Sequence, residues 1–523
     1  MSRTFPRALV IAASLAAIAG AQAQDTAATP PAANPNYAAP VAPQPIVTDA
    51  TPTQSGIALT LDQCVAQALG KNFAVQVQTF SVDSAKAGVI IAQSAYDPTF
   101  GVTWQKAETK QPLVTSTLST AGGGAKPFTD NQSTVASITQ PVITGGTITG
   151  SYDLARNSSN SLQTLLNPAY DGQTSLTVTQ PLLQGAGIGY ARATIQIAKL
   201  GAHIAGLNFK STVLTTVLNV ETAYYNLIYS RRQQAVAQDN VTLAKRLLDE
   251  NTTKRQTGVL TDLDVVTAQA GLATAQSQLI SSRQAMENAE DTLFEAMGER
   301  EFHTPVGIVD FPILPSTEVS FYVSYKLARD NGPNLAIIQD TIGQLKLDAL
   351  RAKRNFLPLL NVTGGAGYLD AEHSYTSAEN NLWPGPGYNW NAGVTLSIPI
   401  GLRQSKALYR QARDNLDSEQ VSFDQADQQL TVQVRAAVRA VTSNVENVTA
   451  STQAAVLSQK QYDLQKAKFD AGLATSYDVL NAQTLLEQAR VTELQSQVNL
   501  RLALANLHFL EGSSLAAYHI NVE

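Results

Sequence analysis

Apolar residues recur at the three- and four-residue spacing of a helix through two long windows of the chain. Thr212–Tyr229 shows the pattern in the first window, and Thr484–Leu507 shows it in the second. No proline lies between Pro181 and Pro305 or after Pro399. Because proline inside a helix removes a donor and clashes with the preceding turn, both windows can be continuous helix. We predict two long helical hairpins whose small and amide side chains suit close packing.

A different pattern, in which apolar residues alternate with Thr, Ser, Asn and Gly, occupies segments outside these windows. Such runs, with aromatic residues near their ends, are typical of membrane-spanning barrel strands, although a soluble hairpin has the same pattern. The chain offers two strands in its second half and two to four in its first. Because a barrel needs about eight strands, several chains must share one barrel. The runs are Thr99–Lys106, Ser133–Gln140, Thr147–Leu154, Thr174–Gln180, Leu359–Tyr368 and Asn389–Ile398.

The two helical windows share a motif around a central glycine. Residues 254–275 read KRQTGVLTDLDVVTAQAGLATA, and residues 468–489 read KFDAGLATSYDVLNAQTLLEQA. The match holds at one constant offset, so the chain is a duplication. It is sharpest at a predicted turn between two helices, which suggests that the turn itself has a function. The matched pairs include Gly258 and Gly472, Thr261 and Thr475, and Asp264 and Asp478.

The N-terminus has the features of a secretory signal. Arg3 and Arg7 precede the apolar run Ala8–Ala19, and Ala21-Gln22-Ala23 is a small-residue cleavage site. The apolar run is too short to span a membrane. We therefore predict a signal peptide over residues 1–23, followed by a flexible leader rich in Pro and Ala over residues 24–56.

Composition narrows the classes of function. The formal net charge is −6 and only 15% of residues are charged, against about 25% in globular proteins. No Lys/Arg run occurs, which argues against nucleic acid as a partner. The five histidines lack metal-ligand spacing, and neither a P-loop nor a nucleophile–base grouping is present. We expect no catalytic residue, metal or cofactor, and no enzyme activity; the single cysteine, Cys64, is expected to be buried in a helix.

Several segments together carry a resemblance to a known family. They are the opening segment IALTLDQCVAQALGKN at Ile57–Asn72, the junctions TVTQPLLQG at Thr177–Gly185 and LSIPIGLRQ at Leu396–Gln404, and the turns TGVLTDLDV and AGLATSYDVLNAQ. On these segments the chain resembles the TolC-type outer-membrane efflux proteins over roughly residues 57–512.

The resemblance implies a mainly α fold with membrane β structure. Duplicated long helical hairpins would form a trimeric α-barrel in the periplasm, and a shared β-barrel would lie in the outer membrane. The implied partners are two further copies of the chain, outer-membrane lipid, a periplasmic adaptor (membrane fusion) protein, and an inner-membrane pump of the RND, ABC or MFS type. The implied function is a passive exit duct for efflux or type I secretion.

Two other functions remain as alternatives. A periplasmic adaptor also has long coiled-coil helices, but it needs a lipoyl-like β-domain split around one hairpin. A passive porin would lack the long helices.

The resemblance also suggests the domain organisation. Residues 57–300 form a first repeat with strands at about 99–182, and residues 318–512 form a second with strands at about 359–400. Residues 301–317 connect the repeats in the equatorial region, and residues 513–523 form a C-terminal tail. Two strands per repeat, as in the family, give 12 strands per trimer. A further hairpin at about 133–157, turning at Gly145-Gly146, would give 18.

The repeated turns are the candidate functional residues. By resemblance, the hairpin tips dock the adaptor. Glycine at each turn permits a positive φ and a close backbone approach. The tip residues are Gly258, Val259 and Leu260 in the first repeat and Gly472, Leu473 and Ala474 in the second.

The pore entrance is expected just beyond the tips. By resemblance, Asp478 contributes to a ring of aspartates at the narrowest point of the tunnel, and a second family aspartate falls on Asn481. Thr261 and Thr475, each three residues before an aspartate, also fit a helix-capping pattern. We predict capping for Asp264, and both capping and pore lining for Asp478.

Overall fold

The computed structural model describes residues 57–112, 126–161, 164–300, 306–309, 319–381 and 387–520. The predicted signal peptide and leader lie outside these residues, as does most of the predicted connector. Within the connector, β6 (Val306–Val309) pairs in parallel with β1 (Ile57–Leu59).

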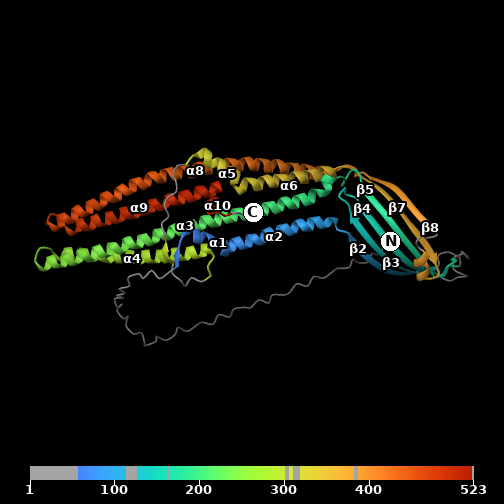
Figure 1. Ribbon diagram of the computed structural model, residues 1–523, viewed down its shortest axis with the longest axis horizontal. Helices are drawn as coiled ribbons and strands as arrows, with labels where there is room; N and C mark the ends of the chain where they lie inside the picture. The colour runs from blue at the N-terminus through green and yellow to red at the C-terminus, as the bar shows by residue number, and fades with distance from the viewer. Residues whose placement is uncertain are drawn as a thin grey trace, which may run out of the picture. The chain divides into compact units, whose positions relative to one another are not determined.

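Two long helical hairpins form the α-helical part of the molecule. The first joins α3 (Ile188–Gln256) to α4 (Asp262–Met297), and the second joins α8 (Arg403–Asp470) to α9 (Ser476–Glu511). With 69 and 68 residues, α3 and α8 are each roughly 100 Å long. The hairpins lie side by side, and α3 packs along α9 as well as α4 (Figure 1). The predicted pair of long hairpins is confirmed.

Shorter helices complete both repeats. The first repeat contains α1 (Leu61–Lys71), α2 (Phe73–Gln93) and the 3-10 turn η1 (Ser94–Tyr96), and the second contains α5 (Phe321–Asn331) and α6 (Pro333–Asn355). Both α2 and α6 pack on α3, and each leads into the strands of its repeat. Each repeat therefore has the order short helix, longer helix, strands, long helix, returning helix.

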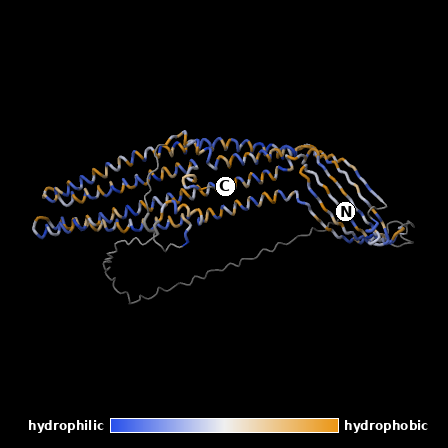
Figure 2. The backbone as a smooth tube through the Cα atoms, in the orientation of Figure 1, coloured by the Kyte–Doolittle hydropathy of each residue, from blue (hydrophilic) through white to orange (hydrophobic). Residues whose placement is uncertain are grey.

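Hydrophobic and hydrophilic positions are interleaved along the helices (Figure 2). Among the described residues, no helix combines the length and apolar character needed to cross a membrane.

A single antiparallel sheet holds six strands in the order β2-β3-β4-β5-β7-β8. The segment turning at Gly145-Gly146 joins this sheet as β3 and β4, so the first repeat supplies four strands and the second supplies two. A short helix that the sequence did not predict, α7 (Tyr375–Asn381), lies between β7 and β8 and packs on β5 and β7. The strands are β2 (Thr99–Lys110), β3 (Phe128–Pro141), β4 (Thr147–Ser159), β5 (Ala169–Pro181), β7 (Leu359–Glu372) and β8 (Gly387–Ser397).

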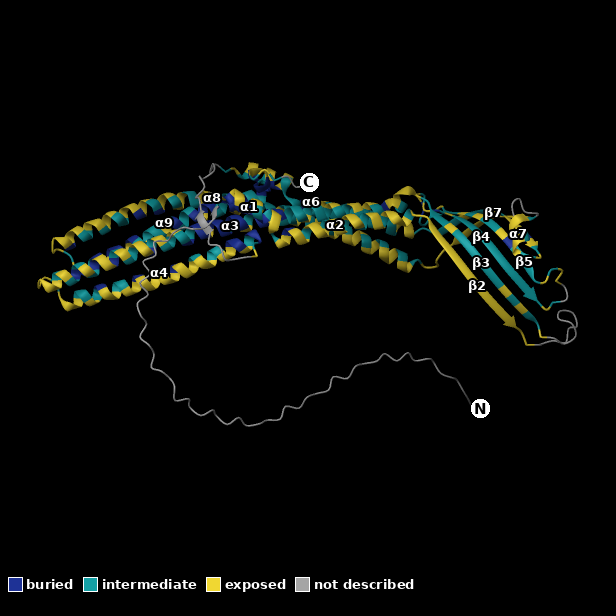
Figure 3. Cartoon of the chain, turned by 60° about the horizontal axis from the view of Figure 1, so that its bottom comes forward, coloured by how far each residue is buried: buried dark blue, intermediate teal, exposed yellow. Residues whose placement is uncertain are grey.

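The two faces of the sheet differ in chemistry. One face, here called the apolar face, carries exposed large side chains from every strand: Phe100, Val102, Trp104, Ile138, Ile148, Leu176, Val178, Val362, Trp390, Val394 and Leu396. The opposite, polar face is dominated by Thr, Ser, Asn, Gln and Gly. Further from the helices the apolar face becomes charged, and Arg156 pairs there with Asp130 at 3.1 Å. Figure 3 shows edge strand β2 exposed along its length.

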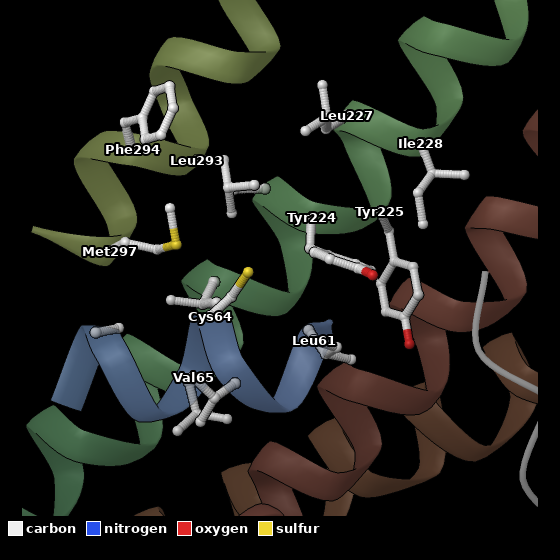
Figure 4. Packing of buried hydrophobic residues seen from close by; sticks show 14 of the residues in the cluster. Leu61, Cys64, Val65, Tyr224, Tyr225, Leu227, Ile228, Leu293, Phe294 and Met297 are labelled. Atoms are coloured by element: carbon white, nitrogen blue, oxygen red, sulfur yellow. The ribbon is translucent and has the colours of Figure 1, made fainter. Parts of the chain in front are cut away.

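The largest hydrophobic core packs α1 against α3 and α4 (Figure 4). Tyr224 is buried at its centre, and its hydroxyl donates to the Leu59 carbonyl at 3.3 Å. Cys64 is fully buried in the same core, as predicted, and burial raises the pKa of its thiol to about 11. The thiol therefore contributes packing and carries no charge at neutral pH.

The C-terminal segment is tied to this core by a buried acid. After α10 (Ser514–Ala517), the Tyr518 hydroxyl donates to Glu221 Oε1 at 2.5 Å, and Ile520 packs against the core. Glu221 is 6% exposed, and this burial raises the pKa of its carboxyl group. The tyrosine thus supplies a hydrogen bond to a carboxylate on α3 whose ionised form burial would otherwise disfavour.

Candidate functional site

The two hairpin turns have the same backbone geometry. Gly258 has a φ of +79° and Gly472 a φ of +74°. In the first turn the Val259 amide donates to the Lys254 carbonyl at 2.9 Å, and in the second the Leu473 amide donates to the matching carbonyl at 2.8 Å. This pattern closes a helix with a left-handed residue, a position that favours glycine. The repeat is therefore sharpest here because both turns need the same residue at the same place.

The predicted tip residues divide into two groups. Val259 and Leu473 are 70% and 80% exposed, and a Cβ added to either turn glycine would meet no atom. In contrast, Leu260 and Ala474 turn inward. They pack against a small core shared by the two hairpins, whose buried members are Leu247, Phe469 and Val479.

Each returning helix starts with a capping box. The Thr261 amide and hydroxyl donate to Asp264 Oδ2 at 3.0 and 2.7 Å, and the Asp264 amide donates back to the Thr261 hydroxyl at 3.4 Å. Thr475 and Asp478 repeat this arrangement at 2.9, 2.7 and 3.3 Å. Hydrogen bonds from the Thr475 hydroxyl and then its amide lower the pKa of Asp478. Asn481, one turn further along, is exposed.

A buried amide fastens the two hairpins to each other. Asn251, on α3, is fully buried, and its Nδ2 donates to the Ser476 hydroxyl on α9 at 2.9 Å. The same nitrogen donates to the Asp264 carbonyl at 3.1 Å. Ser476 is 1% exposed. Separating the hairpins would break a hydrogen bond that is shielded from water.

Charged side chains also join α3 to the second hairpin. Lys466, on α8, lies 2.6 Å from Glu250 on α3 and 2.8 Å from Asp470. Partial burial opposes the lysine charge, but these two carboxylates outweigh it and raise the pKa of Lys466. Lys254 lies 3.8 Å from Asp470 and places its ammonium 3.8 Å from the ring centroid of Phe469. We call the Asn251–Ser476 bond together with the Lys466–Glu250 and Lys254–Asp470 pairs the hairpin latch.

Further from the tips, a second polar contact joins the same hairpins. The Gln483 amide, on α9, donates to the Asn240 carbonyl on α3 at 3.1 Å, and the Asn240 side chain bonds Glu487. Partial burial raises the pKa of Glu487. Within the described residues, no group of His, Cys, Asp or Glu could hold a metal ion.

Sequence patterns alone did not indicate the latch residues. The repeat singles out positions that match, whereas the buried bond of the latch uses positions that differ between the copies. Asn251 corresponds to Gln465 in the second repeat, and Ser476 corresponds to Asp262 in the first. Because the latch joins one repeat to the other, its two sides must be complementary and need not be alike. Positions that differ between the two repeats beside the matched turns are the sequence signal that could have indicated the latch.

Comparisons with known proteins agree on one family. The sequence profile of a family described as "Outer membrane efflux protein" matches residues 147–299 and 325–513. The chain is 24% identical over 339 residues to "Outer membrane protein TolC" of Escherichia coli (strain K12), covering 60% of this chain and 66% of that protein. It is 25% identical over 362 residues to "Outer membrane efflux protein BepC" of Brucella suis, covering 67% and 73%.

Solved structures share the fold. The Campylobacter jejuni CmeC outer membrane channel superimposes with a TM-score of 0.63 at 17% identity, covering 86% of this chain and 85% of that one. At this identity the similarity establishes the arrangement of helices and strands.

Proposed function

The chain belongs to the outer membrane efflux protein family, and we propose that it forms the exit duct of a tripartite efflux or type I secretion system. The duct would run from the periplasm through the outer membrane and conduct its cargo passively. An inner-membrane pump of the RND, ABC or MFS type would supply the energy. The observation that carries this proposal is the continuity, within one chain, of two helical hairpins with a sheet that has one apolar face and one polar face. The longer helix of each hairpin is roughly 100 Å long.

The sheet supports a shared membrane wall. Its apolar face suits lipid and its polar face suits a water-filled lumen. Six strands are too few to close a membrane barrel, and open edges are not tolerated in lipid. We therefore propose a homotrimer, as the resemblance implies.

The alternatives fit the structure less well. An adaptor would place its strands around a single hairpin, whereas here two hairpins each lead back from one shared sheet. A porin would not have the four long helices. The proposed role requires no catalysis by this chain.

We propose that the hairpin tips bind the periplasmic adaptor protein. Gly258, Val259, Gly472 and Leu473 form an outward surface that the chain itself leaves uncovered. Two exposed aliphatic side chains at the ends of polar helices suit contact with another helical hairpin. Leu260 and Ala474 would act indirectly, by supporting the turns from the shared core.

We propose further that the hairpin latch holds the periplasmic entrance closed. Separation of the two hairpins of one chain would widen the tunnel there, and it would break the latch. Asp478 and Asn481 would line this entrance. The Asp478 carboxylate is held at the start of α9 by its capping box, and three copies would create a focused negative field that favours cations.

Loss of export in a strain without this protein tests the proposal. We expect accumulation of pump substrates in that strain and recovery when the wild-type chain is restored. Membrane fractionation with chemical cross-linking should place a trimer in the outer membrane. A monomer in mild detergent by light scattering, or recovery in the inner-membrane fraction, would contradict the proposed duct.

A further inference from the structure

We infer that the assembled outer-membrane wall has 18 strands, a third of them supplied by the hairpin β3–β4. This inference rests on the proposed trimeric duct and concerns how its wall is built. Three features of the hairpin support it: its pairing, its faces and its anchored turn.

The hairpin is paired along nearly its full length with the strands on both sides. β3 pairs with β2 from Thr99↔Thr139 to Lys110↔Phe128, and β4 pairs with β5 from Thr147↔Thr179 to Asn157↔Ala169. At 14 and 13 residues, β3 and β4 are as long as their neighbours and exceed the 9–11 residues that a tilted membrane strand needs. The hairpin therefore lies inside the sheet, between β2 and β5.

The hairpin also continues both faces of the sheet. Ile138 on β3 and Ile148 on β4 are exposed on the apolar face, whereas Ser137 and Thr149 lie on the polar face. One register line on the apolar face crosses all six strands through Phe100, Ile138, Gly150, Leu176, Ala366 and Trp390. A hairpin folded into the lumen or onto the outer surface would break this continuity.

The turn of the hairpin is anchored where the sheet meets the helices. The Gly187 amide donates to the Thr144 carbonyl at 3.1 Å, and the Thr144 hydroxyl donates to Gln180 Oε1 at 2.7 Å. Gly145 has a φ of +91°, and a Cβ there would lie 2.3 Å from the Gly185 carbonyl oxygen. Only glycine allows this approach, so the turn is seated on the β5–α3 junction.

Loop lengths agree with this placement. The turn between β3 and β4 spans only residues 142–146, beside the helices. The connections at the other end, residues 111–127, 160–168 and 373–386, are longer. Membrane barrels of this class have short periplasmic turns and longer external loops.

The edges of the sheet suit closure by further copies. Because the six antiparallel strands are even in number, β2 and β8 run in opposite directions. The free edge of β2 in one copy can therefore pair antiparallel with the free edge of β8 in the next. Three copies joined in this way give 18 strands, and no edge remains in lipid.

A wall of 18 strands is wide. Barrel diameter grows roughly linearly with strand number, so this wall would be about half as wide again as one of 12 strands. Among the described strand residues, the polar face carries only two charged side chains, Asp153 and Asp171. The outer part of the duct therefore suits bulky polar cargo and has a mild preference for positive charge.

Removing the hairpin tests the inference. Deleting residues 128–159 removes two antiparallel strands that start and end on the same side of the sheet. β2 remains antiparallel to β5, and residues 111–127 with 160–168 still connect them. We expect the deletion variant to assemble with 12 strands. The largest neutral polymer that enters from the outer side should then fall in diameter by about a third.

Two controls make the result decisive. Electron cryomicroscopy of the wild-type protein counts the strands directly and does not depend on folding of the variant. The pair Val102→Cys and Val394→Cys, each three residues from the end of β2 or β8 that lies nearest the helices, should cross-link neighbouring copies into a covalent trimer. A trimer whose wall has 12 strands and excludes the hairpin, or an unchanged polymer cutoff in the variant, overturns the inference and leaves the proposed duct intact. Failure to find a trimer in the outer membrane would overturn both.

Discussion

Removing the Ser476 hydroxyl should open the hairpin tips. In the closed form, Asn251 Nδ2 has two hydrogens and two acceptors, the Asp264 carbonyl at 3.1 Å and the Ser476 hydroxyl at 2.9 Å. Ser476→Ala deletes one acceptor and leaves a fully buried N–H without a partner. Once the hairpins separate, water can satisfy the same group. The substitution therefore penalises the closed form selectively.

The size of the effect follows from burial. A buried donor that loses its acceptor costs about 1–3 kcal/mol. If this cost falls on the closed form alone, the ratio of open to closed form rises about 5- to 150-fold for each chain of the trimer. Ser476 is the first residue of α9, and its side chain does not close the capping box, so the helix start should remain intact.

Planar-bilayer recordings of the purified trimer measure this ratio as open probability. Ser496→Ala is the matched control, because its hydroxyl donates to the Thr492 carbonyl of its own helix at 2.9 Å. We expect the control to behave as wild type. If Ser476→Ala opens no more often than Ser496→Ala while both trimers form normally, the latch does not hold the entrance closed.

Three further predictions concern the caps, the tips and the C-terminal segment. Asp264→Asn and Asp478→Asn should lower the melting temperature similarly, since their capping boxes match. Only Asp478→Asn should reduce cation selectivity in bilayers. If the two variants have equal selectivity, Asp478 does not line the pore. Leu473→Asp should leave the trimer and its melting temperature unchanged, since the side chain is 80% exposed, yet abolish export in cells; normal export would exclude docking at this tip. Tyr518→Phe should destabilise the fold by about 1.5–3 kcal/mol in denaturant unfolding, because a buried carboxylate loses its donor. Burial raises the pKa of Glu221 in the folded protein above its unfolded value near 4.3, so the folded protein keeps this proton to a higher pH. The free energy of unfolding should therefore fall as pH rises from the unfolded pKa to the folded pKa, and Glu221→Gln should flatten this fall.

Local features of the sequence were enough to predict the long helices and the turns between them. The absence of proline from two windows allowed helices of 69 and 68 residues, and the turn glycines have the positive φ that the repeat suggested. Thr261 and Thr475 lie at N-caps, each three residues before an aspartate. The threonine hydroxyl accepts from the aspartate amide, and the aspartate carboxylate accepts from the threonine amide. These outcomes depend on neighbours close along the chain, which a sequence shows directly.

Tertiary structure decided how many strands belong to the sheet and which residues hold the two hairpins together. Alternating residues at about 133–157 were compatible with a separate hairpin or with the wall, and only their pairing with β2 and β5 placed them in the sheet. Leu260 and Ala474 were predicted as tip residues together with the turn glycines, and only the packing of the two hairpins placed them against a shared core. Asn251 and Ser476 are 225 residues apart in the chain and have ordinary neighbours along it. Their bond exists only because the two repeats pack together, and complementarity between distant surfaces has no local pattern.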